Sequence, residues 1–484
     1  MLSDLIRACA VGVLGYFVLL AASYLMVTLT SGLAVREYFR RRSGATLRRT
    51  LRSRMTPPVT ICVPAFGEEA TIAASIRAML TVTFGHHDVV VCNDGSVDRT
   101  LERLVESFDM HRVDQPVHPA IPTALVRGIY RSRSHPNLVV IDKLNGGRGD
   151  ALNAAINVAQ TPLICCVDAD SILDHDALLS AVQPFIDRPE VTLGAGGIIR
   201  VANGCRIEEG SVVSTGLARN PLALLQTVEY MRSFVAARTG WSGINGLLII
   251  SGAFGVFRRA AVVDVGGFAT DSIGEDFELC VRLHKQAKDM GTGGRLTFIP
   301  DPVCWTEVPE RLKDLGGQRD RWHRGLIDTL WRHRRMIGNP RYGAIGMLAL
   351  PFFTLFEFLG AFIELGGYAV VIVGLATGAV DGTFALLFFA VAVLVGLLLS
   401  LAAVLIEELA FRRYARVRDL FVMLAVAVAE NLGYRQLILA YRVRGFFGYL
   451  RGNKGWGEIQ RVGFDPPELP GLPSVVTSGG EEVP

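Results

Sequence analysis

The sequence predicts an α/β fold in which a mostly parallel sheet is inserted between transmembrane helices. Long apolar runs occupy both ends of the chain, and short β-branched runs alternate with helical patterns in the middle. Half of the 484 residues are hydrophobic, yet 20% are charged, a mixture typical of a soluble domain joined to membrane segments. The net charge of +3 indicates no general nucleic-acid footprint, so we expect no nucleic-acid partner.

The N-terminal segment, residues 1–55, is predicted to be a membrane anchor with a basic flank. Residues 8–35 carry no charge, and this uncharged run is longer than the roughly 20 residues that span a bilayer. The run is too long for a signal-peptide core and lacks a clear cleavage site. The arginines that follow it are Arg36, Arg40, Arg41, Arg42, Arg48, Arg49, Arg52 and Arg54. By the positive-inside rule, the next domain is cytoplasmic. We expect a multi-pass protein of the plasma (inner) membrane.

Residues 56–335 are predicted to form the sheet domain. Continuous apolar strands separated by helices are typical of a parallel sheet covered on both faces. The expected strands are residues 59–64, 87–94, 138–143 and 162–170, and the expected helices are residues 69–80, 99–108 and 150–159. In such sheets ligands bind at the carboxyl ends of the strands.

Polar sequences follow three of these strands: "PAFGEE", "NDGSVDRT" and "DADS". Asp168 and Asp170 of "DADS" taken alone could form only a turn, since aspartate is common after strands. Three polar ends of one sheet should converge on one crevice, which favours a site for a nucleotide and for Mg2+ or Mn2+ held by these two carboxylates. The glycine-rich "NGGRGD" (145–150) could bring backbone N–H groups to phosphate or be only a turn.

Three later stretches are further candidates. "SGAFGVFRR" (251–259) suits either a wall against which a ring packs or a strand with a close backbone approach. Glu275 and Asp276 stand at a probable helix start, where they either favour the helix dipole or supply a general base. In "QRDRW", Gln318, Arg321 and Trp322 share one helix face. That face suits a sugar ring and a diphosphate, or it marks the membrane surface, or both.

Residues 336–465 are predicted to be membrane and interfacial helices. Residues 382–406 form an uncharged span, and residues 342–380 should give an interfacial helix followed by a span. Residues 421–441 are either a span whose ionisable residues face a bundle interior or an interfacial hairpin. The tail, residues 466–484, has a disordered composition. The eight cysteines show no C-x-x-C pair, and those inside apolar runs indicate buried thiols in a reducing compartment.

Taken together and in this order, "NDGSVDRT", "DADS", "GED" and "QRDRW" resemble the motifs of membrane-embedded, processive family 2 glycosyltransferases. That family includes the cellulose, chitin, hyaluronan and poly-N-acetylglucosamine synthases. The resemblance extends from about residue 59 to 464. It implies a GT-A fold and a metal-dependent, inverting transfer from a nucleotide sugar, usually a UDP-sugar.

The resemblance also implies roles for individual residues. Asp94 matches the aspartate that contacts the uridine part, and Glu68 lies in the first nucleotide-contacting loop. The resemblance assigns Asp168 and Asp170 to the metal and the diphosphate, Asp276 to the catalytic base, and Gln318, Arg321 and Trp322 to the diphosphate and the acceptor sugar. Two positions depart from the usual motifs: Asn93 replaces an aspartate and Gly274 replaces a threonine. The stretch "NKGWGEIQRVGF" near Trp456 has no chemical role that we can assign.

The function expected from this resemblance is growth of a β-linked polysaccharide from UDP-N-acetylglucosamine or UDP-glucose. The polymer would leave through the membrane helices, with accessory export proteins as possible partners. One alternative is a single transfer to a membrane lipid, which product length would distinguish. Another is an inactive scaffold in a secretion complex, which the presence of every expected catalytic carboxylate disfavours.

Overall fold

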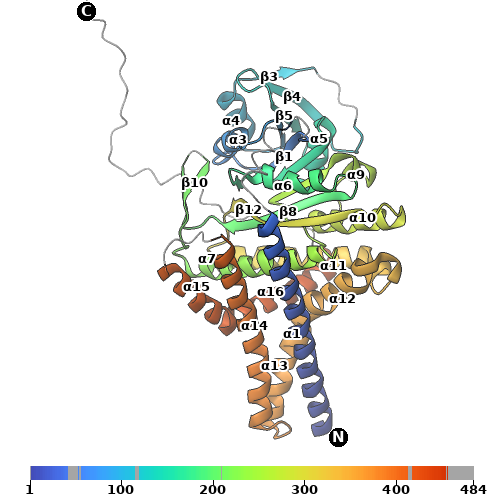
Figure 1. Ribbon diagram of the computed structural model, residues 1–484, viewed down its shortest axis with the longest axis vertical. Helices are drawn as coiled ribbons and strands as arrows, with labels where there is room; N and C mark the ends of the chain where they lie inside the picture. The colour runs from blue at the N-terminus through green and yellow to red at the C-terminus, as the bar shows by residue number, and fades with distance from the viewer. Residues whose placement is uncertain are drawn as a thin grey trace, which may run out of the picture.

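The computed structural model describes residues 2–41, 53, 56–114, 119–208, 210–411, 417–453 and 455. Most of the basic flank, the Trp456 stretch and the predicted tail lie outside these residues. Figure 1 shows three levels: a sheet domain at the top, a layer of helices lying across beneath it, and long helices running downward to the end that carries the N-terminus.

A ten-stranded mixed sheet forms the upper level, in the order β3-β4-β5-β2-β1-β6-β11-β8-β12-β7. Strands β4, β11 and β7 run against the other seven, so the sheet is mostly parallel, as predicted. The strands are β1 Val59–Ala65, β2 His87–Asn93, β3 Met110–Val113, β4 Val126–Ser132, β5 Leu138–Lys143, β6 Leu163–Val167, β7 Ile172–Leu173, β8 Thr192–Val201, β11 Phe254–Arg258 and β12 Arg295–Thr306.

The four predicted strands are β1, β2, β5 and β6, which pair in parallel at the centre of the sheet. The helices between them are α3 Ile72–Leu80, α4 Thr100–Ser107 and α5 Arg148–Val158. The fourth strand ends at Val167 rather than residue 170, because the chain turns there and the Ser171 N–H donates to the Asp168 carbonyl at 3.0 Å. The aspartate pair therefore sits in the turn itself.

The structure adds strands that the sequence pattern did not predict, above all β8 and β12. The glycines of β8, "TLGAGGIIRV", weaken its strand pattern, yet they allow neighbouring side chains to pack closely. A Cβ at Gly197 would lie 2.6 Å from Val303 Cγ1, and one at Gly194 would lie 2.8 Å from Phe257 Cδ1. Strand β11 likewise shows the close backbone approach that was one interpretation of "SGAFGVFRR", since a Cβ at Gly255 would lie 2.6 Å from Ile250 Cγ2.

The middle layer contains α7 Pro221–Met231, α11 Leu312–Arg332, α15 Val417–Ala429 and α16 Arg435–Leu450. A π-helical turn, η6 Glu430–Tyr434, joins the last two, and within it Leu432 and Gly433 have non-helical backbone angles. Residues 417–450 are long and apolar enough to cross a membrane. However, Figure 1 shows α15 and α16 beside α7 and α11, which favours the interfacial hairpin.

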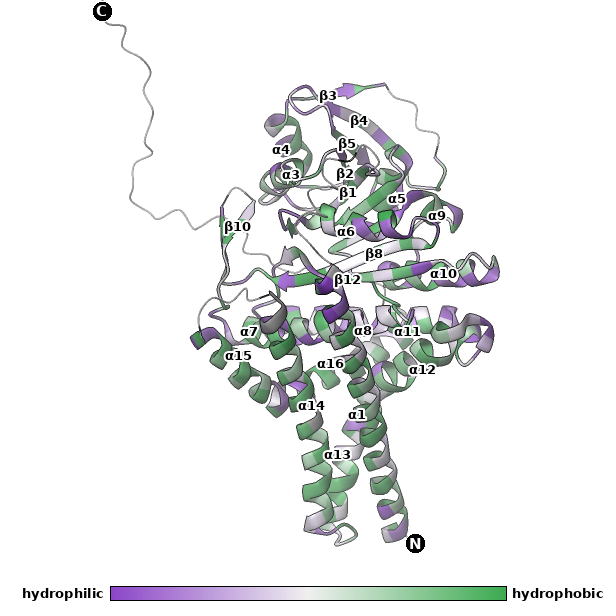
Figure 2. Ribbon diagram, in the orientation of Figure 1, coloured by the Kyte–Doolittle hydropathy of each residue, from purple (hydrophilic) through white to green (hydrophobic). Residues whose placement is uncertain are grey.

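The long helices are α1 Leu2–Arg41, α13 Gly360–Ala376 and α14 Gly382–Phe411. Figure 2 shows them as predominantly hydrophobic along their lower lengths. By length and composition the described residues contain three candidate membrane spans, or four if the bent pair Ile345–Phe358 and Gly360–Ala376 counts as one. The 44° bend of that pair agrees with the expected interfacial helix followed by a span.

The tight packing of β8 against β12 gives a stability prediction. Gly197→Ala would place a methyl group against the Val303 side chain and should lower the free energy of unfolding by about 1–3 kcal/mol. Thermal or denaturant unfolding of the detergent-solubilised protein measures the change. In the control Gly366→Ala on α13, the added Cβ meets no atom within 4 Å. Equal stability of the two variants would contradict the packing argument.

Candidate active site

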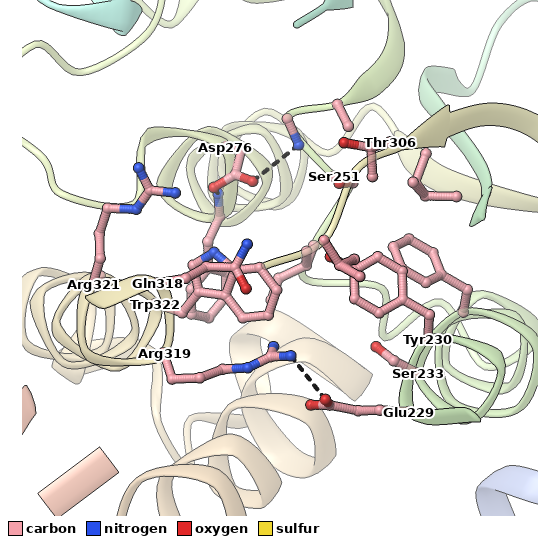
Figure 3. Close-up of a pocket in the computed structure, with 18 of the residues that line it drawn as sticks. Glu229, Tyr230, Ser233, Ser251, Asp276, Thr306, Gln318, Arg319, Arg321 and Trp322 are labelled. Carbon is pink, nitrogen blue, oxygen red and sulfur yellow. Dashed lines mark hydrogen bonds and ion pairs between the residues drawn. The ribbon is translucent and has the colours of Figure 1, made fainter. Parts of the chain in front are cut away.

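A cavity of about 1160 Å³ lies between the sheet domain and the helix layer. Six of the predicted site residues line it: Asp168, Asp170, Asp276, Gln318, Arg321 and Trp322. They come from the turn after β6, from the start of α10 Glu275–Asp289 and from α11. Figure 3 shows Asp276 facing the same space as Gln318, Arg321 and Trp322. The structure therefore brings together residues that lie more than 150 positions apart in the chain.

The aspartate pair forms one wall of this cavity. The side chain of Asp168 is one-third exposed and Asp170 is buried. Among the described residues, no group of three or more His, Cys, Asp or Glu side chains is arranged to hold a metal ion. Mg2+ and Mn2+ favour oxygen ligands, and Mg2+ is commonly bound through one or two carboxylates plus substrate phosphates. The pair fits such an ion if phosphate and water complete its coordination.

Arg148, the first residue of α5, joins three parts of the site. Its Nε donates to Asp168 Oδ1 at 2.8 Å, its Nη1 to Glu275 Oε1 at 2.6 Å and its Nη2 to the Gly252 carbonyl at 2.8 Å. Burial acts to lower the pKa of Arg148, but Asp168 and Glu275 outweigh it and raise that pKa, so the guanidinium stays charged. For buried Glu275, burial raises the pKa while Arg148 opposes the rise.

The sequence interpretation did not select Arg148. The available signal was its position, since it begins a helix directly after a glycine-rich loop at the end of a parallel strand. That loop does not offer its glycine N–H groups to a ligand. Gly146 and Gly147 donate to Asp94 at 3.0 Å and 2.8 Å, which favours the turn interpretation of "NGGRGD".

Asp276 is oriented by two backbone donors. Its Oδ2 accepts from the Gly252 N–H at 3.1 Å, and its Oδ1 accepts from the Phe277 N–H at 2.8 Å. The residue also lies in the first turn of α10, where a carboxylate favours the helix dipole, while its role as a general base stays a prediction. The carboxylate is partly exposed and faces the cavity, as a general base requires.

Close packing explains why position 274 of "GED" is a glycine. A Cβ at Gly274 would lie 3.1 Å from the Gly325 Cα, and a Cβ at Gly325 would lie 3.0 Å from the Gly274 Cα. The start of α10 therefore touches the backbone of α11 at this point. This contact sets the separation between Asp276 and the "QRDRW" face.

Gln318, Arg321 and Trp322 share one face of α11, as predicted, and all three line the cavity. Burial lowers the pKa of Arg321, although nearby Glu275 and Asp168 act to raise it. Gln318 Oε1 is buried without a hydrogen-bond partner in the structure, and the Trp322 side chain is 45% exposed. An unpaired buried oxygen and an exposed indole are both expected on a surface that binds a ligand.

Two predicted residues, Glu68 and Asp94, do not line this cavity. Asp94 is buried and accepts from Lys143 Nζ, which also lies 2.6 Å from Asp150 Oδ2. Burial raises the pKa of Asp94, and Lys143 opposes the rise. Glu68 precedes α3, where its Oε2 accepts from Thr71 Oγ1 at 3.0 Å. The nucleotide-contacting roles of Glu68 and Asp94 stay predictions.

The other departure from the motifs, Asn93, is explained by its neighbours. Its Nδ2 donates to Asp142 Oδ1 at 2.8 Å, and Arg127 Nη2 lies 2.6 Å from the same oxygen. An aspartate at position 93 would place two carboxylates against each other in a buried position, which is unfavourable. The amide therefore suits this chain at that position.

Comparison with known proteins agrees with this geometry. The family model described as "Glycosyl transferase family group 2" matches residues 163–406, and the model "Glycosyl transferase family 2" matches residues 60–208. The chain is 29% identical over 275 residues to poly-beta-1,6-N-acetyl-D-glucosamine synthase of Staphylococcus aureus (strain COL), covering 57% of this chain and 56% of that protein. It is 26% identical over 274 residues to the enzyme of the same name from Staphylococcus epidermidis, with the same coverage. The chain thus spans about half the length of these curated relatives.

The fold has a counterpart among solved structures. The mannosyltransferase PcManGT from Pyrobaculum calidifontis, solved in complex with GDP-Man and Mn2+, superposes with a TM-score of 0.53 and 18% sequence identity. The match covers 90% of this chain and 99% of that one. This similarity confirms the predicted GT-A-type sheet domain between apolar helices.

The Arg148 contacts give a pH-dependent stability prediction. Arg148→Met would leave Glu275 and Asp168 without their partner and should lower the free energy of unfolding by about 3–5 kcal/mol near neutral pH. The loss should be smaller near pH 5, because the pKa of Glu275 would rise further and the carboxyl would bind a proton in the folded state. A raised folded-state pKa makes stability fall as pH rises. Denaturant unfolding at both pH values measures the effect.

Arg127→Met is the matched control, because the Arg127 side chain is 42% exposed in its pair with Asp142. Partly exposed pairs contribute about 0–1 kcal/mol. A pH-independent loss in Arg148→Met, or a loss no larger than in Arg127→Met, would contradict the role given to Arg148.

Proposed function

The chain belongs to glycosyl transferase family group 2, and on that premise we propose that it transfers a sugar from a UDP-sugar onto a growing β-linked polysaccharide, with inversion. The observation that carries the proposal is the single cavity shared by an aspartate pair, an oriented carboxylate and the "QRDRW" face. Between the two expected donors, the names of the curated relatives favour UDP-N-acetylglucosamine over UDP-glucose.

The donor would lie with its diphosphate between the turn after β6 and α11. Asp168 and Asp170 would hold Mg2+ or Mn2+, and that ion, when bound, neutralises diphosphate charge. Arg321 lines the same cavity and would bind the departing diphosphate as a second cation. Gln318 Oε1 would accept a hydrogen bond from a sugar hydroxyl, which would satisfy its buried oxygen.

The acceptor sugar would stack on the exposed face of Trp322. Asp276 would take the proton of the acceptor hydroxyl, while the hydroxyl oxygen bonds to the anomeric carbon and the bond from that carbon to the UDP oxygen breaks. The Gly252 and Phe277 N–H groups hold the Asp276 carboxylate in one orientation. Attack from the face opposite the leaving group converts an α-linked donor into a β-linkage.

The proposal includes a membrane arrangement. We propose that α1, α13 and α14 cross the plasma membrane, with the sheet domain in the cytoplasm, where nucleotide sugars are made. Residues of the membrane-side helices also line the cavity, among them Tyr24 of α1 and Arg442 of α16. A growing polymer would therefore pass Trp322 and enter between these helices.

One observation favours a second candidate function, the single transfer to a membrane lipid. Phe352 and Phe353, in the first segment of the bent helix pair, line the cavity and would suit an apolar chain. The two functions differ in product length. A lipid-acceptor enzyme gives a single-sugar product that an organic solvent extracts. A polymer synthase gives a long chain that the solvent does not extract.

The test is an assay of the purified, detergent-solubilised protein with a panel of labelled UDP-sugars. We expect transfer from UDP-N-acetylglucosamine into a product that a β-specific hexosaminidase digests. Transfer from no member of the panel would contradict the proposed donor class. A single-sugar lipid product would replace the polymer by the second candidate.

Asp276→Asn tests the proton acceptor. The amide is nearly isosteric but cannot take the proton, so kcat should fall by about two to four orders of magnitude. UDP binding should stay within about twofold of the original, since the carboxylate touches the acceptor and not the nucleotide. Loss of UDP binding, or a kcat near that of the unaltered protein, would refute this role.

Metal removal tests the aspartate pair. EDTA should abolish transfer, because the diphosphate charge then lacks its counter-ion. Added Mn2+ or Mg2+ should restore transfer. Asp170→Ala should keep the fold, as measured by thermal unfolding, while its UDP binding no longer responds to Mn2+. Full activity of the EDTA-treated protein would show that the pair serves another purpose.

A further inference from the structure

Trp322, the proposed acceptor platform, is held from one side by Arg319, a residue of "QRDRW" to which the sequence analysis assigned no role. The guanidinium carbon of Arg319 lies 4.3 Å from the centroid of the Trp322 ring. Arg319 precedes Trp322 by three positions on α11, so the two side chains are neighbours on the helix. In the view of Figure 3, Arg319 lies on the side of Trp322 away from Asp276. One ring face is thereby covered, and the other is left for a ligand.

Arg319 is itself held by a residue of another helix. Its Nη2 donates to Glu229 Oε2 of α7 at 2.8 Å, and the side chain of Arg319 is only 4% exposed. Burial acts to lower the pKa of Arg319, but Glu229 outweighs it, so the guanidinium stays charged over the ring. Both Glu229 and Arg319 line the cavity.

A third element completes the chain of contacts. The same oxygen, Glu229 Oε2, accepts from the Tyr434 hydroxyl at 2.7 Å. Tyr434 closes the π-helical turn at which the α15–α16 hairpin breaks, and it is buried. Glu229 therefore receives one donor from α11 and one from the hairpin, which leaves its carboxylate little freedom to turn.

We propose that Glu229 is a positioning residue of the acceptor site: through Arg319 it fixes the plane of the Trp322 ring, and with it the distance from the acceptor hydroxyl to Asp276. The inference rests on the proposed function, because it assigns an acceptor sugar to Trp322. A purely structural tie between α7 and α11 would change stability alone. A positioning role changes acceptor binding and leaves donor binding intact.

The test compares Glu229→Ala and Glu229→Gln. In Glu229→Ala, Arg319 loses its partner and the ring is free to rotate. A displacement of about 1 Å at a reacting group costs on the order of a hundredfold in rate. We therefore expect the KM for a short β-linked N-acetylglucosamine oligosaccharide to rise by about tenfold or more. The KM for UDP-N-acetylglucosamine and its slow hydrolysis should stay unchanged, and the product should shorten. Glu229→Gln keeps an oxygen acceptor and should recover most of the acceptor affinity.

Asp328→Asn is the matched control. Asp328 lies on α11, as Arg319 and Trp322 do, pairs with Arg332 at 2.9 Å and accepts from Ser272 at 2.9 Å, yet it does not line the cavity. We expect it to lower the unfolding temperature without changing either KM. Equal acceptor KM values in Glu229→Ala and the unaltered protein, or a rise shared by Asp328→Asn, would overturn the proposal.

A second readout does not need turnover. The fluorescence of Trp322 is obtained by subtracting the emission of a Trp322→Phe variant from the emission of the same protein with Trp322 present. In the Glu229→Ala background this difference should be quenched more strongly by acrylamide, whereas Asp328→Asn should leave it unchanged. Unaltered quenching in Glu229→Ala would overturn the positioning role. If quenching changes but the unaltered protein uses no UDP-sugar, the proposed function fails while the effect of Glu229 on Trp322 through Arg319 stands.

Discussion

The site depends on one buried guanidinium that holds together carboxyl groups from different parts of the chain. Asp168, Asp170, Glu275 and Asp276 line one cavity, and the Arg148 guanidinium bonds to two of them and to the Gly252 carbonyl. A buried charge without a partner is strongly unfavourable, so this contact ties α5, the turn after β6 and α10 into one arrangement. Everything that the cavity is proposed to do, from ion binding to proton transfer, requires these groups to stay at their present separations.

Topology explains why distant motifs meet. The parallel strands β5, β2, β1 and β6 end at the same edge of the sheet, and the "DADS" turn follows one of them. The α10 and α11 motifs approach that edge from the other side, at the separation set by the Gly274–Gly325 contact. The helix layer lies between this edge and the long helices, and residues of both the layer and the long helix α1 line the cavity.

Much of this arrangement was predictable from local pattern. The apolar runs gave the central strands, the anchor and α14, and helical spacing gave the shared face of Gln318, Arg321 and Trp322. Strands β8 and β12 were missed because glycines such as Gly197 weaken the strand pattern. The packing that accounts for Gly197 involves a distant residue, Val303. Arg148 and Glu229 were missed for a related reason: each acts through contacts with residues far away in the chain, and nothing in their local sequence marks those partners.

We propose above all that one cavity holds the diphosphate of the donor, the metal ion and the acceptor platform. The most direct measurement is an experimental density map of the protein with UDP and Mn2+, with anomalous scattering used to locate manganese. We expect the ion about 2 Å from carboxylate oxygens of Asp168 and Asp170, with the diphosphate between it and Arg321. A diphosphate bound outside this cavity, or manganese distant from both aspartates, would contradict this expectation.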